Sequence, residues 1–237
     1  MNMLSEEQCS DIHVASEEIL NHTGVILDHQ PSIKLLTDAG AVADGTRVYI
    51  PPGLVRKALA SAPDMIVLHS RDGDPAMFLG KDRCYFGTGS DTATTVDPFT
   101  GEQVSTNYET VKRFTRFTDA LPNIEFIMSM GSARDYDVDS FVAQFCAMIC
   151  NTLKPVVFTA QGIKDLTNIY DIMKVAYGSE DEIRLRPRTL LYTEPISPLF
   201  HTKKELEMIM FCAEQSIPVT VPSGINAGAT APVTLAG

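Results

Sequence analysis

From residue 123 onward, the sequence alternates short apolar segments with longer amphipathic ones, at intervals of about thirty residues. The short segments have the length and β-branched content of strands, and the longer ones repeat apolar side chains at helical spacing. Such alternation predicts βαβ units and a parallel sheet, either an open doubly wound sheet or a closed (β/α)8 barrel. The strand candidates are residues 124–130, 155–159, 189–193 and 218–221, and the helix candidates are 137–151, 163–177 and 202–215.

Only four such units fit between residue 123 and residue 237, whereas a closed barrel needs eight strands. If the sheet belongs to a (β/α)8 TIM barrel, about half of that barrel is present, with the other half lost or supplied by another chain. Residues 1–122 show another pattern, with helices and short strands separated by Asp, Gly and Pro turns. The expected domains are an N-terminal α+β region at 1–122 and the first four βα units at 123–237.

Local signals predict the elements of the N-terminal region. Ser5 and Gln8 form a capping-box pattern at the start of the first helix, and Gly24 supplies its stop. Further helices are expected from Pro31 to Gly40, at 52–60 and at 107–120, and strands at 47–50, 65–69, 76–79 and 83–86. Near the other end of the chain, a loop of small residues follows residue 221 and leads to a helix expected to begin at Pro232.

The composition is that of a globular protein with an acidic balance. Hydrophobic residues make up 44% of the chain and charged residues 21%, and the formal net charge is −11. This charge disfavours nucleic acid and anionic membranes as partners. No apolar run approaches the roughly 18 residues that span a bilayer, and the first residues lack a signal-peptide pattern, so we expect a cytoplasmic protein. The five cysteines favour free thiols over a disulfide framework.

In both parallel-sheet architectures, ligands bind beyond the carboxyl ends of the strands. This rule selects the segments 129–134, 160–162, 194–200 and 222–230. Glu194 follows the third strand candidate directly, where we expect solvent to screen its charge poorly, so this carboxylate could face a cationic ligand. The alternative is a structural ion pair with Arg134, Arg186 or Arg188.

Three other features carry weaker signals. The loop around Gly228 could bring backbone N–H groups close to a ligand, or could be a tight connection with Thr230 as the N-cap of a helix. Residues 85–91 contain a Gly-x-Gly pair without the third glycine and the helix of a dinucleotide-binding motif, so we expect a loop beside the barrel mouth. Cys146 and Cys150 share a helix face, but without further ligands nearby we expect core residues and no metal.

Short segments spread over nearly the whole chain resemble, in the same order, one protein family. These segments are Leu4-Ser5-Glu6-Glu7-Gln8, Glu18-Ile19-Leu20, Thr23-Gly24-Val25, Ala39-Gly40-Ala41, Arg47-Val48, Ile50-Pro51-Pro52, Ala60-Ser61-Ala62-Pro63, Ala120-Leu121-Pro122-Asn123-Ile124, Glu194-Pro195-Ile196-Ser197-Pro198-Leu199 and the run from Gly228 to Gly237. They resemble the N-terminal half of the corrinoid-dependent trimethylamine methyltransferase family, and their shared order is more specific than any single match.

The resemblance implies a TIM-barrel enzyme of one-carbon metabolism, including methanogenesis. Members of the family move a methyl group from a methylated amine to the Co(I) corrinoid of a separate carrier protein, so this chain would bind no cofactor directly. Some use trimethylamine and contain pyrrolysine, and relatives without it use quaternary amines such as glycine betaine. The family's chains are about twice this length, and the pyrrolysine position lies outside this half. The expected partners are the corrinoid carrier, a small methylated amine and further copies of the chain.

The resemblance and the positions at strand ends together suggest site residues. A quaternary ammonium leaves as a neutral amine, so the site must orient the methyl group and exclude water, and aromatic rings and a carboxylate suit the cation. The expected carboxylate is Glu194. The aromatic candidates are Tyr85, Tyr192 and Phe200, and the expected pocket floor contains Ser197, Ser223, Asn226 and Gly228.

Two other functions stay open at this stage. One is a lyase or hydrolase that uses Glu194 as an acid or base without a corrinoid partner. The other is a catalytically inert binding or assembly module, because a half barrel exposes two sheet edges and apolar surface and should associate with another chain.

Overall fold

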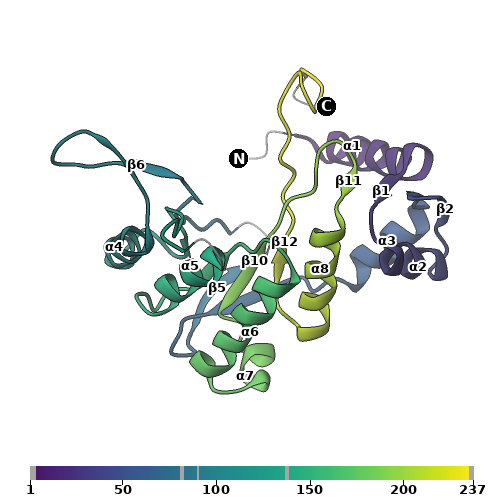
Figure 1. The fold of residues 1–237 in the computed structure, drawn as a ribbon. Coiled ribbons are helices and arrows are strands. Elements are labelled where there is room, and N and C mark those ends of the chain that lie inside the picture. The colour runs from purple at the N-terminus through teal and green to yellow at the C-terminus, as the bar shows by residue number, and fades with distance from the viewer. Residues whose placement is uncertain (1–3, 81–82, 90, 137–138, 235–237) are drawn as a thin grey trace. The chain divides into compact units, whose positions relative to one another are not determined.

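The computed structural model describes residues 4–80, 83–89, 91–136 and 139–234. They form two compact units built from interleaved stretches of chain (Figure 1). The N-terminal unit contains residues up to Pro63, Glu194–Glu207 and the residues from Val221 on, and the parallel-sheet unit contains Asp64–Thr193 and Met208–Thr220. The boundary expected at residue 122 stays a prediction.

The N-terminal unit begins with a helix that the sequence signals in full. Ser5 caps α1 (Glu6–Glu18), and its hydroxyl and the Gln8 side chain exchange hydrogen bonds with each other's backbone N–H groups, which confirms the capping box. A short π-helix, η1 (Ile19–Thr23), continues α1 and ends at Gly24, which has φ +70°. A side chain on Gly24 would lie 2.6 Å from the Val48 carbonyl oxygen, so both the turn and the close approach require glycine here.

A four-stranded sheet forms the rest of this unit, in the order β11-β1-β3-β2. The strands β1 (Val25–Leu27), β3 (Arg47–Tyr49) and β2 (Val42–Asp44) are antiparallel, and β11 (Phe200–His201) pairs with β1 in parallel. The helices α2 (Gln30–Asp38) and α3 (Pro52–Ser61) begin at prolines or next to them, as expected. The sequence did not predict β1, β2 and β11, which are three, three and two residues long.

The parallel-sheet unit confirms the predicted alternation of strands and helices. Its central sheet has the order β12-β10-β9-β8, and every pair is parallel. The strands follow one another across the sheet in their order along the chain, without the reversal that marks a doubly wound sheet, although β11 of the other sheet lies between β10 and β12 in the sequence. The strands are β8 (Ile127–Met128), β9 (Val156–Phe158), β10 (Thr189–Tyr192) and β12 (Val219–Thr220).

Helices cover one face of this sheet (Figure 1). They are α4 (Tyr108–Asp119), α5 (Ser140–Ile149), α6 (Ile163–Tyr177), α7 (Glu180–Leu185) and the part of α8 (Lys203–Gln215) that belongs to this unit. Their apolar side chains and those of Ile127, Phe158 and Leu191 form the largest buried cluster. Because side chains alternate along a strand, Met128, Val157 and Leu190 point to the other face, where they pack against the hairpin of β4 (Ile66–His69) and β5 (Pro75–Leu79).

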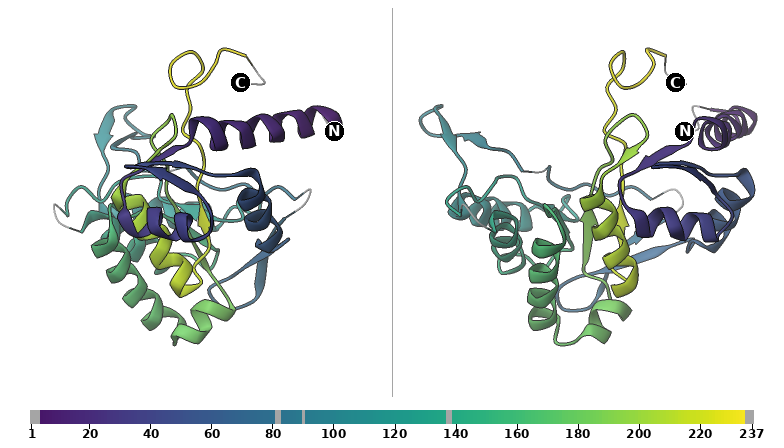
Figure 2. Two further views of the ribbon diagram at one scale, coloured as in Figure 1. Left: turned by 90° about the vertical axis from the view of Figure 1, so that its right-hand side faces the viewer. Right: turned by 45° about the vertical axis from the view of Figure 1, so that its right-hand side comes forward.

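A second hairpin, of β6 (Thr94–Val96) and β7 (Gln103–Ser105), precedes α4. Figures 1 and 2 show it projecting beyond α4, and Phe99 in its turn is 95% exposed. The sequence did not predict this hairpin, because its strands are short and mostly exposed.

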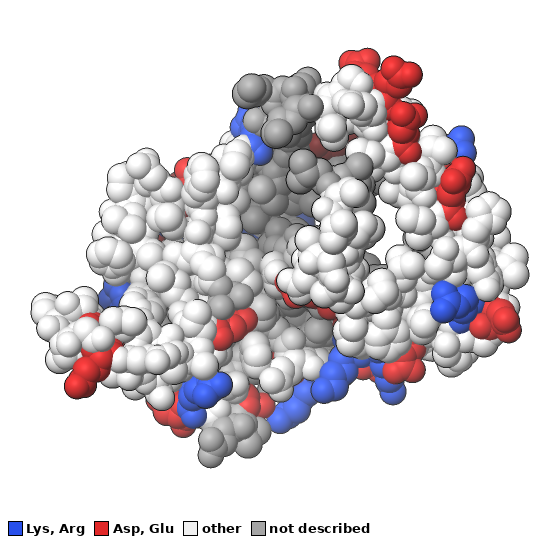
Figure 3. Space-filling view, turned by 90° about the horizontal axis from the view of Figure 1, so that it is seen from above, with Lys and Arg blue, Asp and Glu red and all other residues white. Residues whose placement is uncertain are grey.

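No helix among the described residues is long and apolar enough to cross a bilayer. The described surface in Figure 3 is formed mostly by uncharged residues.

Two expected elements are absent from the described residues. Residues 83–86 form no strand, although Phe86 exchanges hydrogen bonds with Glu125 beside the edge strand β8. Further along, the Thr88 hydroxyl rather than a backbone carbonyl accepts the Met128 N–H, so no regular ladder forms.

The helix expected to begin at Pro232 is also absent as far as Thr234, and residues 235–237 lie outside the described residues. The Thr230 hydroxyl accepts a hydrogen bond from the backbone N–H of Asn226 instead of capping a helix. The Asn226 carbonyl accepts from the N–H groups of Ala229, Thr230 and Ala231, which closes this segment into a compact turn.

Candidate functional site

A polar cluster lies at the carboxyl ends of β8 and β9, around Asp91. Its carboxylate accepts a hydrogen bond from the Gln144 side chain at 2.8 Å and another from the Thr159 hydroxyl at 3.0 Å. Thr159 is the first residue after β9, and the backbone N–H of Asp91 donates to the carbonyl of Ser129, the first residue after β8. Asp91 therefore lies at the edge of the sheet where parallel α/β proteins bind their ligands.

The main chain of Asp91 is as firmly held as its side chain. Its φ of 52° is a left-handed conformation, which aspartate tolerates better than most residues. Its carbonyl accepts a hydrogen bond from the Ser132 hydroxyl at 3.1 Å. Gln144 is itself buried on α5, and its carbonyl oxygen accepts from the Ala133 N–H at 3.3 Å, so the Gln144 amide group is oriented from both sides.

The charge of Asp91 has neutral partners. Burial raises the pKa of this carboxyl group above its ordinary value, and the hydrogen bonds from Thr159 and Gln144 offset part of that rise. In the described part of the chain, no lysine or arginine forms an ion pair with Asp91. A half-buried carboxylate without a counter-ion, at a strand end, is a group that a cationic ligand would stabilise.

Sequence reasoning missed Asp91. It identified residues 85–91 only as a loop beside the barrel mouth, and no periodicity connects this loop with α5 and β9. The available signal was an acidic residue that ends a run of Gly, Thr and Ser beside a strand. The chain order alone could not show which strand.

Tyr85 and Tyr192 both belong to the parallel-sheet unit. Both pack against the apolar cluster on the hairpin face of the sheet, which contains Leu68, Met77 and Leu190. The Tyr85 hydroxyl accepts a hydrogen bond from the Phe78 N–H at 2.9 Å, which fixes Tyr85 to β5. Tyr192 is the last residue of β10 and is half-buried. Tyr85 therefore packs on the side of this apolar cluster, and its expected role in substrate binding stays a prediction.

Glu194 is exposed, so the expectation that its charge is poorly screened was wrong. The strand β10 ends at Tyr192, and the chain leaves the sheet before it reaches Glu194. Within the N-terminal unit, a Cβ atom added to Gly224 would lie 3.2 Å from the Glu194 carboxylate. Arg186 and Arg188 both pair with Glu182, at 3.6 and 2.9 Å, and the alternative of a structural ion pair for Glu194 stays a prediction.

The remaining expected site residues also belong to the N-terminal unit. Phe200 is half-buried in β11 and exchanges backbone hydrogen bonds with Ile196, which brackets Ser197 in a short turn. Ser223, Asn226 and Gly228 are exposed in the loop after β12. Asn226 organises this loop through its backbone, and Gly228 adopts φ +78°. Their expected contacts with substrate stay predictions.

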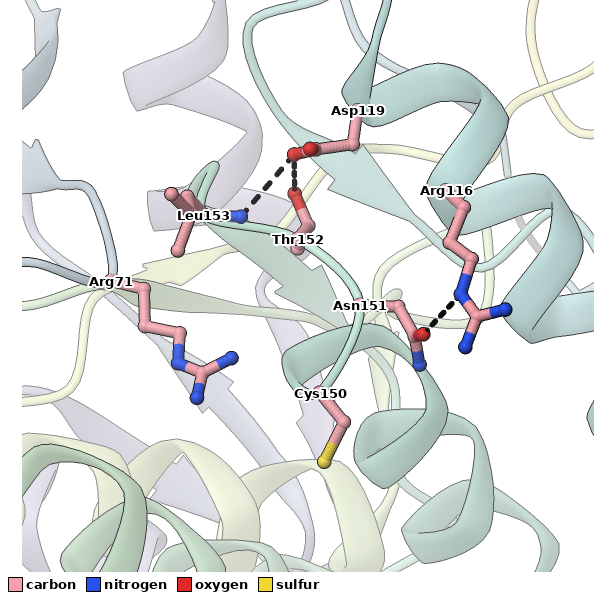
Figure 4. Close-up of a pocket in the computed structure, with 7 residues that line it drawn as sticks. All are labelled: Arg71, Arg116, Asp119, Cys150, Asn151, Thr152 and Leu153. Carbon is pink, nitrogen blue, oxygen red and sulfur yellow. Dashed lines mark hydrogen bonds between the residues drawn. The ribbon is translucent and has the colours of Figure 1, made fainter.

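One hollow of the parallel-sheet unit lies at the opposite end of the strands from Asp91. Figure 4 shows a pocket of about 290 Å³ whose residues Thr152 and Leu153 precede β9, so it lies at the amino ends of the strands. Arg71 donates to the Ile149 carbonyl at 2.9 Å and Arg116 to the Asn151 side chain at 2.6 Å. Positively charged side chains near the carboxyl end of α5 interact favourably with the helix dipole. The arginines of this pocket are therefore explained by capping of that helix end.

The prediction that Cys146 and Cys150 are both core residues is wrong for Cys150. Cys150 lines this pocket and is exposed, because α5 ends at Ile149 and Cys150 lies in the turn beyond it. Cys146 is half-buried, and burial raises the pKa of its thiol. Among the described residues, no group of His, Cys, Asp and Glu is suited to hold a metal ion.

Comparison with known proteins assigns this arrangement to a family. The sequence model of the trimethylamine methyltransferase (MTTB) family matches residues 1–237, the whole chain. The chain belongs to the trimethylamine methyltransferase family. The parallel sheet and the Asp91 cluster are therefore features of a trimethylamine methyltransferase family member.

Curated relatives show the same relationship. The chain is 30% identical over 236 residues to the trimethylamine methyltransferase MttB of Desulfitobacterium hafniense strain DSM 10664 / DCB-2. This match covers 98% of this chain and 48% of the relative. It is 26% identical over 240 residues to the glycine betaine methyltransferase of strain Y51, covering 100% and 50%. The MttB of Methanosarcina thermophila is 28% identical over 256 residues, covering 100% and 51%. The chain spans about half the length of these relatives.

Proposed function

We propose that the complete protein transfers a methyl group from a methylated amine, trimethylamine or a quaternary amine such as glycine betaine, to the Co(I) corrinoid of a carrier protein. The observation that carries this proposal is the family match over the whole chain, together with relatives named for these two substrates. The chain would then supply the first half of the enzyme, with a methylamine substrate and a corrinoid carrier as partners.

We also propose that the parallel sheet is the first half of a (β/α)8 barrel. Three features support this: strand order follows chain order, helices cover one face, and the hairpin β4–β5 packs on the other face. In a closed barrel the second face is the interior. The hairpin is connected to the amino ends of the strands, because His69 donates to the Pro187 carbonyl and Arg71 to the Leu153 carbonyl. It would therefore close the bottom of the barrel and leave the carboxyl ends open to substrate.

The chemistry sets clear tasks for the protein. A Co(I) corrinoid supplies a strong nucleophile, and the nitrogen leaves the methyl carbon with the bonding electron pair, so a quaternary ammonium, or trimethylamine bound as its protonated trimethylammonium ion, leaves as a neutral amine. The residues of this chain need not protonate that leaving group. They must hold the cation, aim one methyl group outward and keep water away from it.

The experiment is methyl transfer by the complete gene product. Trimethylamine, glycine betaine and other methylated amines are each mixed with the enzyme and a Co(I) corrinoid protein, and the cobalt absorption spectrum is followed. We expect conversion to methylcobalt with at least one amine. The 237-residue chain alone is the matched sample, because a half barrel should show no turnover. An unchanged cobalt spectrum with every amine would contradict the proposed function.

A further inference from the structure

We propose that Asp91 binds the positively charged nitrogen group of the methylated amine, an inference that rests on the proposed function. Asp91 joins three stretches of chain at the open end of the sheet: its own loop, α5 through Gln144, and the end of β9 through Thr159. The ligand class is a small tetrahedral ammonium ion that carries methyl groups.

The hydrogen bonds of Asp91 suit a ligand that cannot donate one. A quaternary ammonium has no N–H group, so it can attract a carboxylate by charge but cannot orient its oxygens. Here Gln144 holds one oxygen at 2.8 Å and Thr159 holds the other at 3.0 Å. Both donors are neutral, so the carboxylate is fixed in place while its charge is left for a ligand.

A purely structural role accounts for less of the geometry. If Asp91 only connected the loop to α5 and β9, a neutral acceptor would do so without the cost of burying a charge. The raised pKa of Asp91 reflects that cost. Glu194, the carboxylate that the sequence favoured, is exposed, where water screens its charge. Asp91 is therefore the better-placed carboxylate of the two.

The test uses the complete enzyme with Asp91→Asn, a change that removes the charge and nearly preserves shape. Tetramethylammonium chloride and the neutral tert-butanol serve as competing probes of similar shape. We expect the KM for the amine and the inhibition constant of tetramethylammonium to rise roughly ten- to a hundredfold, with kcat changed much less. The inhibition constant of tert-butanol should stay the same. The control is Glu214→Gln, which removes an exposed charge on α8.

Two results would overturn the inference. An unchanged constant for tetramethylammonium in Asp91→Asn would show that the charge plays no part. An equal loss of both probes would show that the variant had only lost the shape of the site. Thr159→Val is the second variant: it removes one hydrogen bond but keeps the charge, so it should retain most of the preference for tetramethylammonium over tert-butanol. Loss of that preference in Thr159→Val would also count against the inference.

The two proposals fail separately. If the wild-type enzyme transfers no methyl group from any amine, the proposed function fails, and tetramethylammonium binding measured by calorimetry still tests Asp91. If the wild-type enzyme is active and Asp91→Asn matches it in KM and in tetramethylammonium inhibition, only the inference about Asp91 fails.

Discussion

Replacing Phe158 by alanine should destabilise the parallel-sheet unit more than a change at any exposed phenylalanine. Phe158 ends β9, is 1% exposed and lies in the largest apolar cluster. Its ring meets the ring of Phe145 edge to face, with the centroids 5.4 Å apart, so strand and helix α5 are joined through this pair.

The magnitude follows from the burial. A phenylalanine side chain buries roughly 150–250 Å², and at about 25 cal/mol per Å² this corresponds to about 4–6 kcal/mol as an upper bound. Alanine keeps the Cβ atom, but the change leaves a cavity and loses the edge-to-face contact, and buried Phe→Ala changes typically cost about 3–5 kcal/mol. We therefore expect the free energy of unfolding to fall by about 4 kcal/mol, a large share of the roughly 5–15 kcal/mol that stabilises a domain.

The assay is urea unfolding followed by circular dichroism, and the matched control is the same substitution at Phe99. Phe99 is 95% exposed in the turn between β6 and β7, so Phe99→Ala should change the free energy of unfolding by no more than about 0.5 kcal/mol. With a urea dependence of about 1–3 kcal/mol per molar, the midpoint of Phe158→Ala should fall by more than about 1 M. Equal midpoints for the two variants would refute the assignment of the core.

Three further predictions concern single residues in both units. Gly24→Ala should lower the free energy of unfolding by more than about 2 kcal/mol, because the new Cβ would lie 2.6 Å from the Val48 carbonyl oxygen at φ +70°. Gly45→Ala, at φ +60° with no atom within 4 Å, should lower it by about 1 kcal/mol. Equal shifts of the melting temperature in the two variants would contradict this. Because the folded state raises the pKa of Asp91, it binds this proton more tightly than the unfolded state does, so the charge costs stability as pH rises above about 3.9. Asp91→Asn should therefore gain stability relative to wild type between about pH 3 and pH 7, and urea midpoints that show the opposite trend would refute the sign. Burial raises the pKa of Cys212 to about 12, so its thiol should react with Ellman's reagent only after unfolding. The number of thiols that react only in urea should therefore be one lower in Cys212→Ala than in wild type, and an equal number would contradict this.

The sequence predicted the elements whose signals are local. The capping box at Ser5, the glycine stop at Gly24 and the helical repeat at Ile163–Tyr177 are each determined by residues a few positions apart, and the structure confirms all three. The order of apolar segments also predicted the parallel strands, because a βαβ crossover leaves few alternatives.

The elements that the sequence did not predict depend on contacts between distant segments. The strand β11 is two residues long and exists because Phe200 and His201 pair with Ile26 and Leu27 of β1, far away in the chain. Thr88 looks like a strand residue, yet its hydroxyl takes the bond that a ladder would use. Local propensity contains no information about either partner.

The candidate site shows the same limit. The rule that ligands bind at the carboxyl ends of parallel strands selects the end of the sheet where Asp91 lies, but it selects residues by their position after a strand. Glu194 has that position and is exposed. Asp91 precedes the first strand of the sheet in the chain and is held at the carboxyl ends of the strands by hydrogen bonds with Ser129, Gln144 and Thr159.

The most direct test of methyl transfer follows the transferred carbon itself. The complete enzyme is incubated with trimethylamine or glycine betaine labelled with ¹³C in the N-methyl groups and with a Co(I) corrinoid protein, and the carrier is then isolated and its ¹³C NMR spectrum recorded. The proposed function predicts a cobalt-bound ¹³C methyl resonance on the carrier and the amine with one methyl group fewer. A carrier without ¹³C label from either amine, in samples where the enzyme is folded and the cobalt is reduced, would contradict it.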